Sequence, residues 1–191
     1  VIDSIGADTK LITITHMSNV LGSVVDVKKI CKIARNKRIV TLIDGSQSIV
    51  HMPINVSELC CDFFVFTGHK LYGPSASGAI YINQNRFDEM EPFLGGGAMI
   101  NFVGKENITY NKAPHKFEAG TPAIIPIIGL GAAIDFVLSI GQENIVEYEN
   151  RLINYAKDRL YNLDFLNFQG ISIDKGGIFS FTMKENKLHP H

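Results

Sequence analysis

Short apolar runs alternate with a helix-like segment in the first half of this chain. Residues 10–15, 38–43, 62–66 and 78–82 are mainly branched and aromatic, which is the pattern of strands that are covered on both faces. Residues 26–37 lie between the first two runs and place apolar side chains at spacings of three and four, which predicts an amphipathic helix. This alternation predicts an α/β fold with a mostly parallel sheet and helices on both faces.

The second half of the chain has a different pattern. Residues 91–120 read as a loop that is too long for a plain connector, so we expect a functional or intersubunit segment. Residues 124–140 and 142–163 predict two helices, and the first is apolar enough to be buried, although Pro126 and Asp135 argue against a membrane span. Residues 165–169 and 178–183 predict short strands that begin a second domain.

Composition narrows the class of protein. The 191 residues are 46% hydrophobic and 19% charged, which is typical of one folded domain. Lysine and arginine total 18 against 19 acidic residues, so we expect no nucleic-acid partner and no anionic membrane surface. Cys31, Cys60 and Cys61 are an odd number without CxxC spacing, and no signal peptide is visible, so we expect a reducing, cytoplasmic location.

Polar residues follow two of the predicted strands, where ligands bind in open parallel sheets. Lys70 comes after a buried strand and is a candidate Schiff-base lysine, although most lysines are simply solvated. Asp44 could hold a protonated ring nitrogen or serve only the Asp-Gly turn. Thr67 and His69 supply donors for a phosphate. Asn19 is equally consistent with a ligand contact and with an Asx turn.

The remaining polar residues carry weaker signals. Gln47 shares a face with Asp44 only if a helical turn follows the strand. No Walker pattern is present, and the triple glycine at 95–97 does not open a recognisable helix. His16, His51 and His115 have no metal-ligand spacing, so we predict no metal site.

Five motifs together resemble those of the pyridoxal-phosphate-dependent cysteine desulfurases. They follow the family's order from about residue 10 to residue 163. The triple-glycine motif and the last motif favour the Suf-type, or group II, branch of the class V aminotransferases, which also includes selenocysteine lyases. The motifs are His16-Met-Ser-Asn-Val-Leu-Gly22, Asp44-Gly-Ser-Gln47, Thr67-Gly-His-Lys-Leu-Tyr-Gly-Pro74, Gly95-Gly-Gly-Ala-Met-Ile100 and Phe117-Glu-Ala-Gly-Thr-Pro122.

The resemblance implies a fold, a cofactor and a set of residue roles. The fold is the aspartate-aminotransferase type, called fold type I, with residues 1–163 as the C-terminal part of the large cofactor domain and 164–191 as the start of a small α+β domain. Lys70 would form the Schiff base with pyridoxal 5'-phosphate and move the substrate α-proton, while Asp44 would pair with the pyridine nitrogen. Asn19 and Gln47 would contact the phenolic oxygen of the ring.

The resemblance also implies a phosphate site, a homodimer and a reaction. Thr67 and His69 would hold the phosphate, and Thr121 would reach the phosphate of the partner subunit. The family converts L-cysteine to L-alanine and leaves a persulfide on the enzyme, which supplies sulfur for iron–sulfur cluster assembly through a sulfur-acceptor protein.

Departures from the family pattern leave alternatives open. Family members carry an earlier phosphate loop, a histidine that stacks on the cofactor and a later loop with the persulfide cysteine, and we find none of these here. None of Cys31, Cys60 and Cys61 has that context. We therefore expect an internal fragment that is inactive alone. The alternatives are a non-catalytic truncated or split-gene product, and a selenocysteine lyase or aminotransferase of the same fold.

Overall fold

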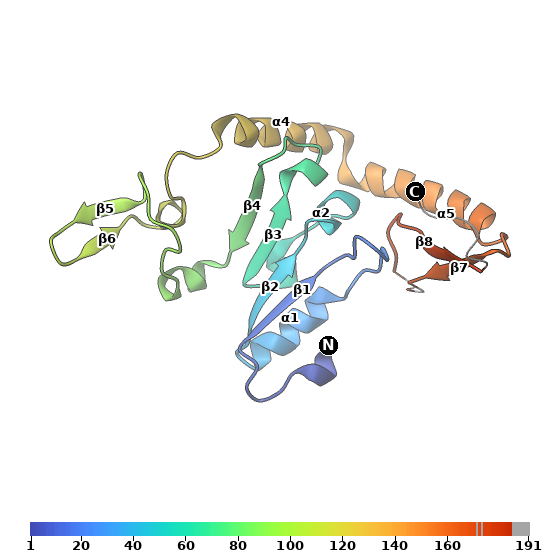
Figure 1. The fold of residues 1–191 in the computed structure, drawn as a ribbon, viewed down its shortest axis with the longest axis horizontal. Coiled ribbons are helices and arrows are strands. Elements are labelled where there is room, and N and C mark those ends of the chain that lie inside the picture. The colour runs from blue at the N-terminus through green and yellow to red at the C-terminus, as the bar shows by residue number, and fades with distance from the viewer. Residues whose placement is uncertain (171, 173, 185–191) are drawn as a thin grey trace.

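The computed structural model describes residues 1–170, 172 and 174–184 of the chain. After a 3-10 turn at Ile2–Ser4, four strands form the central sheet in the order β1-β2-β3-β4 (Figure 1). These strands are β1 (Leu11–Thr15), β2 (Val40–Asp44), β3 (Phe63–Thr67) and β4 (Gly78–Ile82). The first three are parallel and β4 is antiparallel to β3. The predicted α/β fold with a mostly parallel sheet is confirmed.

The connection from β3 to β4 explains why the last strand reverses. A parallel crossover needs a dozen or more residues, whereas this connection holds only a 3-10 turn, η2 (Gly68–Lys70), and a tight loop. The Gly68 N–H donates to the Ser77 carbonyl at 2.8 Å, and the Gly73 N–H donates to the Gly68 carbonyl at 2.9 Å. The chain therefore turns back beside β3.

Helix α1 (Val27–Asn36) covers one face of the sheet. Its N-terminus is capped by the Asp26 carboxylate, which accepts from the Lys29 N–H at 3.0 Å. Its apolar stripe is buried, as the spacing predicts, and packs on strand residues of the same face. The core residues of this layer are Ile12, Val27, Ile30, Cys31, Ala34, Ile39, Ile43, Cys61 and Phe64.

The opposite face of the sheet is partly exposed. Side chains alternate between faces along a strand, and Leu42 and Val65 belong to the face that contributes nothing to the core clusters of the described residues. Leu11 and Ile80, on the same face, are about half exposed. In the described part of the chain, the helix cover predicted for both faces is therefore complete on one face only.

Two long helices follow the sheet, α4 (Ile124–Ile140) and α5 (Gln142–Leu160). The sequence predicts a buried α4, but only Leu130 and Val137 are buried, and Ile125 is 83% exposed. The helix packs through Leu130 and Val137 against Leu71 and nearby partly buried side chains, and most of its other apolar side chains are exposed. No single described helix is long and apolar enough to cross a membrane; only α4 and α5 together reach that composition, and they bend by 74°.

The remaining elements are short. Helices α2 (Ser48–His51) and α3 (Val56–Leu59) hold four residues each, too few for a periodic pattern, and η3 (Gln84–Glu89) follows β4. The segment predicted as a loop instead forms a hairpin, β5 (Ile100–Val103) with β6 (Ile108–Tyr110), and a turn, η4 (His115–Phe117). This hairpin projects away from the sheet, and β7 (Leu166–Gln169) pairs with β8 (Ser180–Met183) beside α5 (Figure 1).

Candidate functional site

The carboxyl ends of the parallel strands bring several of the predicted residues to one edge of the sheet. Asp44 is the last residue of β2 and Thr67 is the last residue of β3. The register pairs Asp44 with Val65, and Thr67 lies two residues further along β3. Because alternate residues of a strand share a face, the side chains of Asp44 and Thr67 lie on the same face at the same edge. That face is the partly exposed one.

The turn after β2 fixes the Asp44 carboxylate. Its Oδ1 accepts from the Ser46 N–H at 2.9 Å, and the Gly45 N–H donates to the Val65 carbonyl at 2.8 Å. A Cβ on Gly45 would lie 1.9 Å from Cζ of the buried Phe64 ring. Only glycine lets the turn pack this closely on β3, so the position of the carboxylate depends on this contact.

The turn after β3 holds a hydroxyl, an imidazole and an amine. Thr67 Oγ1 and His69 Nδ1 are 2.7 Å apart, and Lys70 ends η2 with its side chain partly buried. Gly68 is buried, and a Cβ there would lie 2.0 Å from Ser77 Oγ. The tight turn therefore presents the three polar side chains directly beyond β3.

Gln47 is the N-cap of α2, so the helical turn that its predicted role requires is present. Its amide Nε2 lies 3.4 Å from His51 Nε2, and His51 Nδ1 lies 2.9 Å from the Glu149 carboxylate. Neither His51 nor Glu149 was among the site residues predicted from the sequence. The Gln47–His51 spacing of four residues on a helix was a usable signal, whereas Glu149 lies 98 residues from His51 and had none.

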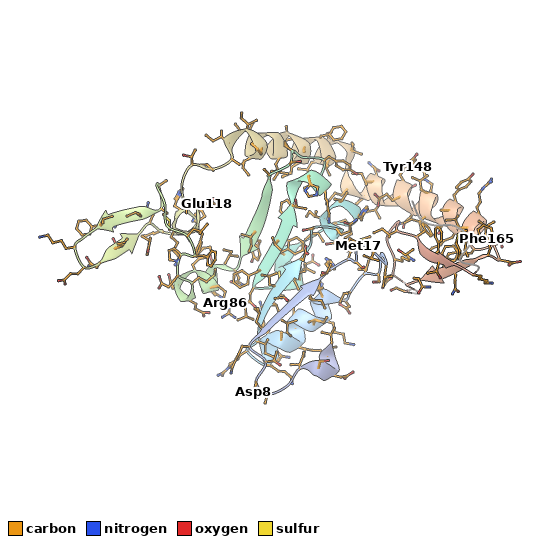
Figure 2. The ribbon with its side chains drawn as sticks, viewed as in Figure 1. Asp8, Met17, Arg86, Glu118, Tyr148 and Phe165 are labelled. Atoms are coloured by element: carbon orange, nitrogen blue, oxygen red, sulfur yellow. The ribbon has the colours of Figure 1, made fainter. Side chains whose placement is uncertain are left out.

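Asn19 is exposed in the loop between β1 and α1, and the C-terminal part of the chain holds this loop. The Val24 N–H donates to the Asp174 carbonyl at 3.0 Å, and the Gly176 N–H donates to the Gly22 carbonyl at 2.9 Å. Met17, at the start of the loop, is fully buried where the sheet meets the C-terminal segment (Figure 2). The loop therefore lies between the two predicted domains.

Thr121 lies apart from the residues at the strand ends. It is exposed between η4 and α4, and no hydrogen bond in the described part of the chain joins it to Thr67 or His69. The neighbouring Gly120 N–H donates to the Gly97 carbonyl at 3.0 Å, and a Cβ on Gly96 would lie 2.8 Å from the Gly120 nitrogen. The triple glycine thus packs on the segment that carries Thr121.

The cysteines lie away from this edge. Cys60 and Cys61 precede the first residue of β3 and so lie at the opposite edge of the sheet from Thr67. Cys31 is in α1, and both Cys31 and Cys61 are buried in the core. Burial raises the pKa of the Cys61 thiol to about 11, with a smaller contribution from Cys31. Cys31 and Cys61 are therefore structural cysteines, whereas Cys60 is only partly buried.

One buried histidine has an unsatisfied atom. His16 follows β1, its backbone N–H donates to the Asp44 carbonyl at 2.9 Å, and its Nδ1 has no partner among the described residues. Burial lowers the pKa of its imidazole. No cluster of three His, Cys, Asp or Glu side chains in the described ranges could hold a metal ion.

Several known proteins are similar to this chain in sequence or in structure. A relative from Halalkalibacterium halodurans, named a probable cysteine desulfurase, is 44% identical over 188 residues, which are 98% of this chain and 46% of the relative. The crystal structure of the cysteine desulfurase CsdA from Escherichia coli matches with a TM-score of 0.89 at 31% identity, over 95% of this chain and 45% of that chain. A C-DES mutant with glycine covalently linked to its PLP cofactor matches with a TM-score of 0.86 at 26% identity, over 96% of this chain and 50% of that chain.

This chain spans less than half the length of the curated relative and about half, or less, of the two solved chains. The superpositions confirm the predicted fold. The family described as aminotransferase class-V matches residues 1–191, and the chain therefore belongs to that family.

Proposed function

We propose that this chain is part of a pyridoxal-phosphate-dependent cysteine desulfurase of the Suf type. The whole enzyme would convert L-cysteine to L-alanine and hold the sulfur as a persulfide for iron–sulfur cluster assembly. The observation that carries the proposal is the convergence of Asp44, Thr67, His69 and Lys70 at one edge of the sheet. The desulfurase relative and the PLP-containing neighbour support it.

The residues at this edge fit the chemistry of pyridoxal phosphate. An anionic carboxylate, Asp44, suits a protonated pyridine nitrogen, and the hydroxyl and imidazole of Thr67 and His69 suit a phosphate. Lys70 supplies a primary amine that can bind the aldehyde carbon. Gly45 and Gly68 stand where a Cβ would clash, so both turns keep the polar side chains close to the strand ends.

The chain's own residues would orient the cofactor and move one proton. Bound pyridoxal phosphate supplies an electron sink for the electrons left at the substrate Cα. Asp44 would keep the ring nitrogen protonated, and Thr67 and His69 would anchor the phosphate. Asn19 and Gln47 would hold the ring oxygen. Lys70 Nζ would take the proton from the substrate Cα and later return a proton to the product.

The wider organisation is also part of the proposal. Residues 1–163 would complete a large cofactor domain and 164–191 would begin a small one, of which residues 171, 173 and 185–191 lie outside the described residues. We place the enzyme in the cytoplasm as a homodimer, with Thr121 reaching the partner's phosphate and a sulfur-acceptor protein receiving the persulfide sulfur. The exposed apolar side chains of α4 support an assembly that covers this helix.

A second candidate is a non-catalytic product that associates with a complementing chain. One observation favours it. Cys31 and Cys61 are buried in the core and Cys60 lies at the edge opposite Lys70, so none of them is placed to receive sulfur there.

Cofactor binding tests the first proposal. The purified chain is mixed with pyridoxal phosphate and its visible absorbance is recorded, together with the Lys70→Ala variant and with Lys32→Ala as the control, because Lys32 is an exposed residue of α1. We expect absorbance that depends on Lys70 and not on Lys32. If the signal is absent or survives Lys70→Ala, this chain does not form the proposed site.

Turnover separates the two candidates. Alanine formation from L-cysteine is measured for this chain alone and for the longest reading frame that contains it. We expect activity only in the longer product. Turnover by this chain alone would mean that one of its own cysteines receives the sulfur, and no turnover in either would favour the non-catalytic candidate. Selenocysteine as substrate distinguishes a selenocysteine lyase.

A further inference from the structure

A row of three polar side chains joins α2 to α5. Gln47 Nε2 lies 3.4 Å from His51 Nε2, and His51 Nδ1 lies 3.0 and 2.9 Å from the two oxygens of Glu149. Gln47 and His51 stand four residues apart and so share one face of the helical turn. The row therefore begins at a residue proposed to contact the cofactor and ends on a different helix.

With a neutral His51 ring, the chemistry of the three groups sets the direction of each hydrogen bond. The Glu149 carboxylate only accepts, so His51 Nδ1 must carry a proton and donate it. In the neutral ring the other nitrogen, Nε2, is then an acceptor, and the Gln47 amide must donate to it. This arrangement leaves the second N–H of the Gln47 amide free and fixes which side of the amide faces the imidazole.

The surroundings hold the row in place. The side chains of His51 and Glu149 are 22% and 25% exposed, so water competes only partly for their hydrogen bonds. Gln142, the first residue of α5, donates from Nε2 to the Ile49 carbonyl at 3.5 Å and forms a second link between the helices. A pocket of about 320 Å³ borders the His51–Glu149 hydrogen bond and is lined by Leu152, Ile153, Ala156 and Phe179 among others.

We propose that His51, oriented by Glu149, is a positioning residue for Gln47 and thereby for the ring oxygen of bound pyridoxal phosphate. The inference rests on the proposed function. Without the imidazole, the Gln47 amide can rotate about its side-chain bonds, because no other hydrogen bond to it exists among the described residues. When the imidazole accepts one N–H of the Gln47 amide, the amide is held in one orientation, and its second N–H is held ready to donate to the ring oxygen of the cofactor.

The His51→Asn variant tests whether His51 orients Gln47 or only links α2 to α5 through its hydrogen bond to Glu149. The asparagine amide can replace Nδ1 as donor to Glu149 but is too short to replace Nε2 as acceptor for Gln47. We expect it to shift the visible absorbance maximum of the bound cofactor in the same direction as Gln47→Ala. It should also weaken pyridoxal phosphate binding by about two- to tenfold, the value of one hydrogen bond. The double variant should be no worse than Gln47→Ala alone, because both remove one interaction.

Two further variants serve as controls. Gln142→Ala removes the other link between α2 and α5 and should leave the absorbance maximum unchanged. Glu149→Gln retains an acceptor for Nδ1 and should give a smaller shift than His51→Asn, which keeps the test open if His51→Asn folds poorly by circular dichroism. A normal spectrum in His51→Asn, or additive losses in the double variant, overturns the positioning role alone. No Lys70-dependent absorbance in the unchanged protein overturns the proposed function, and this inference with it.

Discussion

Replacing Gly45 by alanine should destabilise the protein through one contact in the core. The new Cβ would lie 1.9 Å from Cζ of Phe64 and 2.5 and 2.6 Å from its two Cε atoms. Ordinary carbon contacts are about 3.5 Å or longer, so the ring would have to retreat by about 1.6 Å. Phe64 is 2% exposed and packs with Val27, Ile43 and Cys61, which leaves it no space to retreat.

Overpacking of this kind lowers the free energy of unfolding by about 1–3 kcal/mol. With a urea slope of about 2 kcal/mol/M, the unfolding midpoint should fall by about 0.5–1.5 M. Circular dichroism at increasing urea measures the midpoint. Because Gly45 follows Asp44 directly, we also expect weaker pyridoxal phosphate binding at urea concentrations where the variant is still folded.

Two variants control this prediction. Gly131→Ala adds the same methyl group inside α4, where nothing lies within 4 Å, and should be neutral or slightly stabilising. Phe64→Leu removes part of the ring, so adding it to Gly45→Ala should cost less than the sum of the two single changes. An unchanged midpoint in Gly45→Ala, or strict additivity in the double variant, would refute the reasoning.

Three other predictions concern side chains that are buried or partly buried. Asp62→Ala should lower the free energy of unfolding, measured in urea, by about 2 kcal/mol or more. The reason is that the Asp62 carboxylate accepts hydrogen bonds from the Thr41 N–H and from Arg86 Nε, each at 2.8 Å. A loss below about 0.5 kcal/mol, which is the effect of an ordinary surface change, would contradict this prediction. Burial raises the pKa of Cys61 to about 11, whereas the unfolded thiol ionises near 9, so this group alone should lower the free energy of unfolding by about 2–3 kcal/mol between these pH values. Cys61→Ala should reduce the slope but not abolish it, because the pKa of Cys31 is also raised by burial. Burial lowers the pKa of His16, so the unfolded state takes up the proton first and stability should decline as pH falls below about 6.5; parallel curves for His16→Gln and the unchanged protein would show that His16 is not responsible.

Much of the fold follows from local sequence patterns. The predicted bounds of β4 and α4 are those of the structure, because a turn before the first and a glycine after the second mark their ends. The antiparallel direction of β4 could also have been predicted from its short connection to β3. The hairpin of β5 and β6 was missed because both strands are short and exposed, which leaves no apolar alternation to detect.

The residues of the candidate site that lie at the ends of strands could be predicted from the sequence, whereas those that depend on packing between distant segments could not. Asp44 and Thr67 were found because polar residues that end apolar runs are visible in sequence, and the parallel register brings them to one edge. Glu149 was missed because it lies 98 residues from His51 in the sequence, and only the packing of α5 on α2 brings the two side chains together. The exposure of α4 was missed for a related reason, since composition indicates that a helix prefers burial without indicating what covers it.

The contact between the Asn19 loop and the C-terminal segment has a consequence for synthesis on the ribosome. Ser180 donates from its hydroxyl to the Val20 carbonyl across 160 residues of sequence. At about 5–20 residues per second, translation needs roughly 8–32 s to make the second partner after the first. The first strands of the sheet can pair in that interval, whereas the loop that carries Asn19 still lacks the C-terminal segment that packs on it. Among the proposed cofactor contacts made within one chain, the Asn19 contact should therefore be the last to form in a nascent chain.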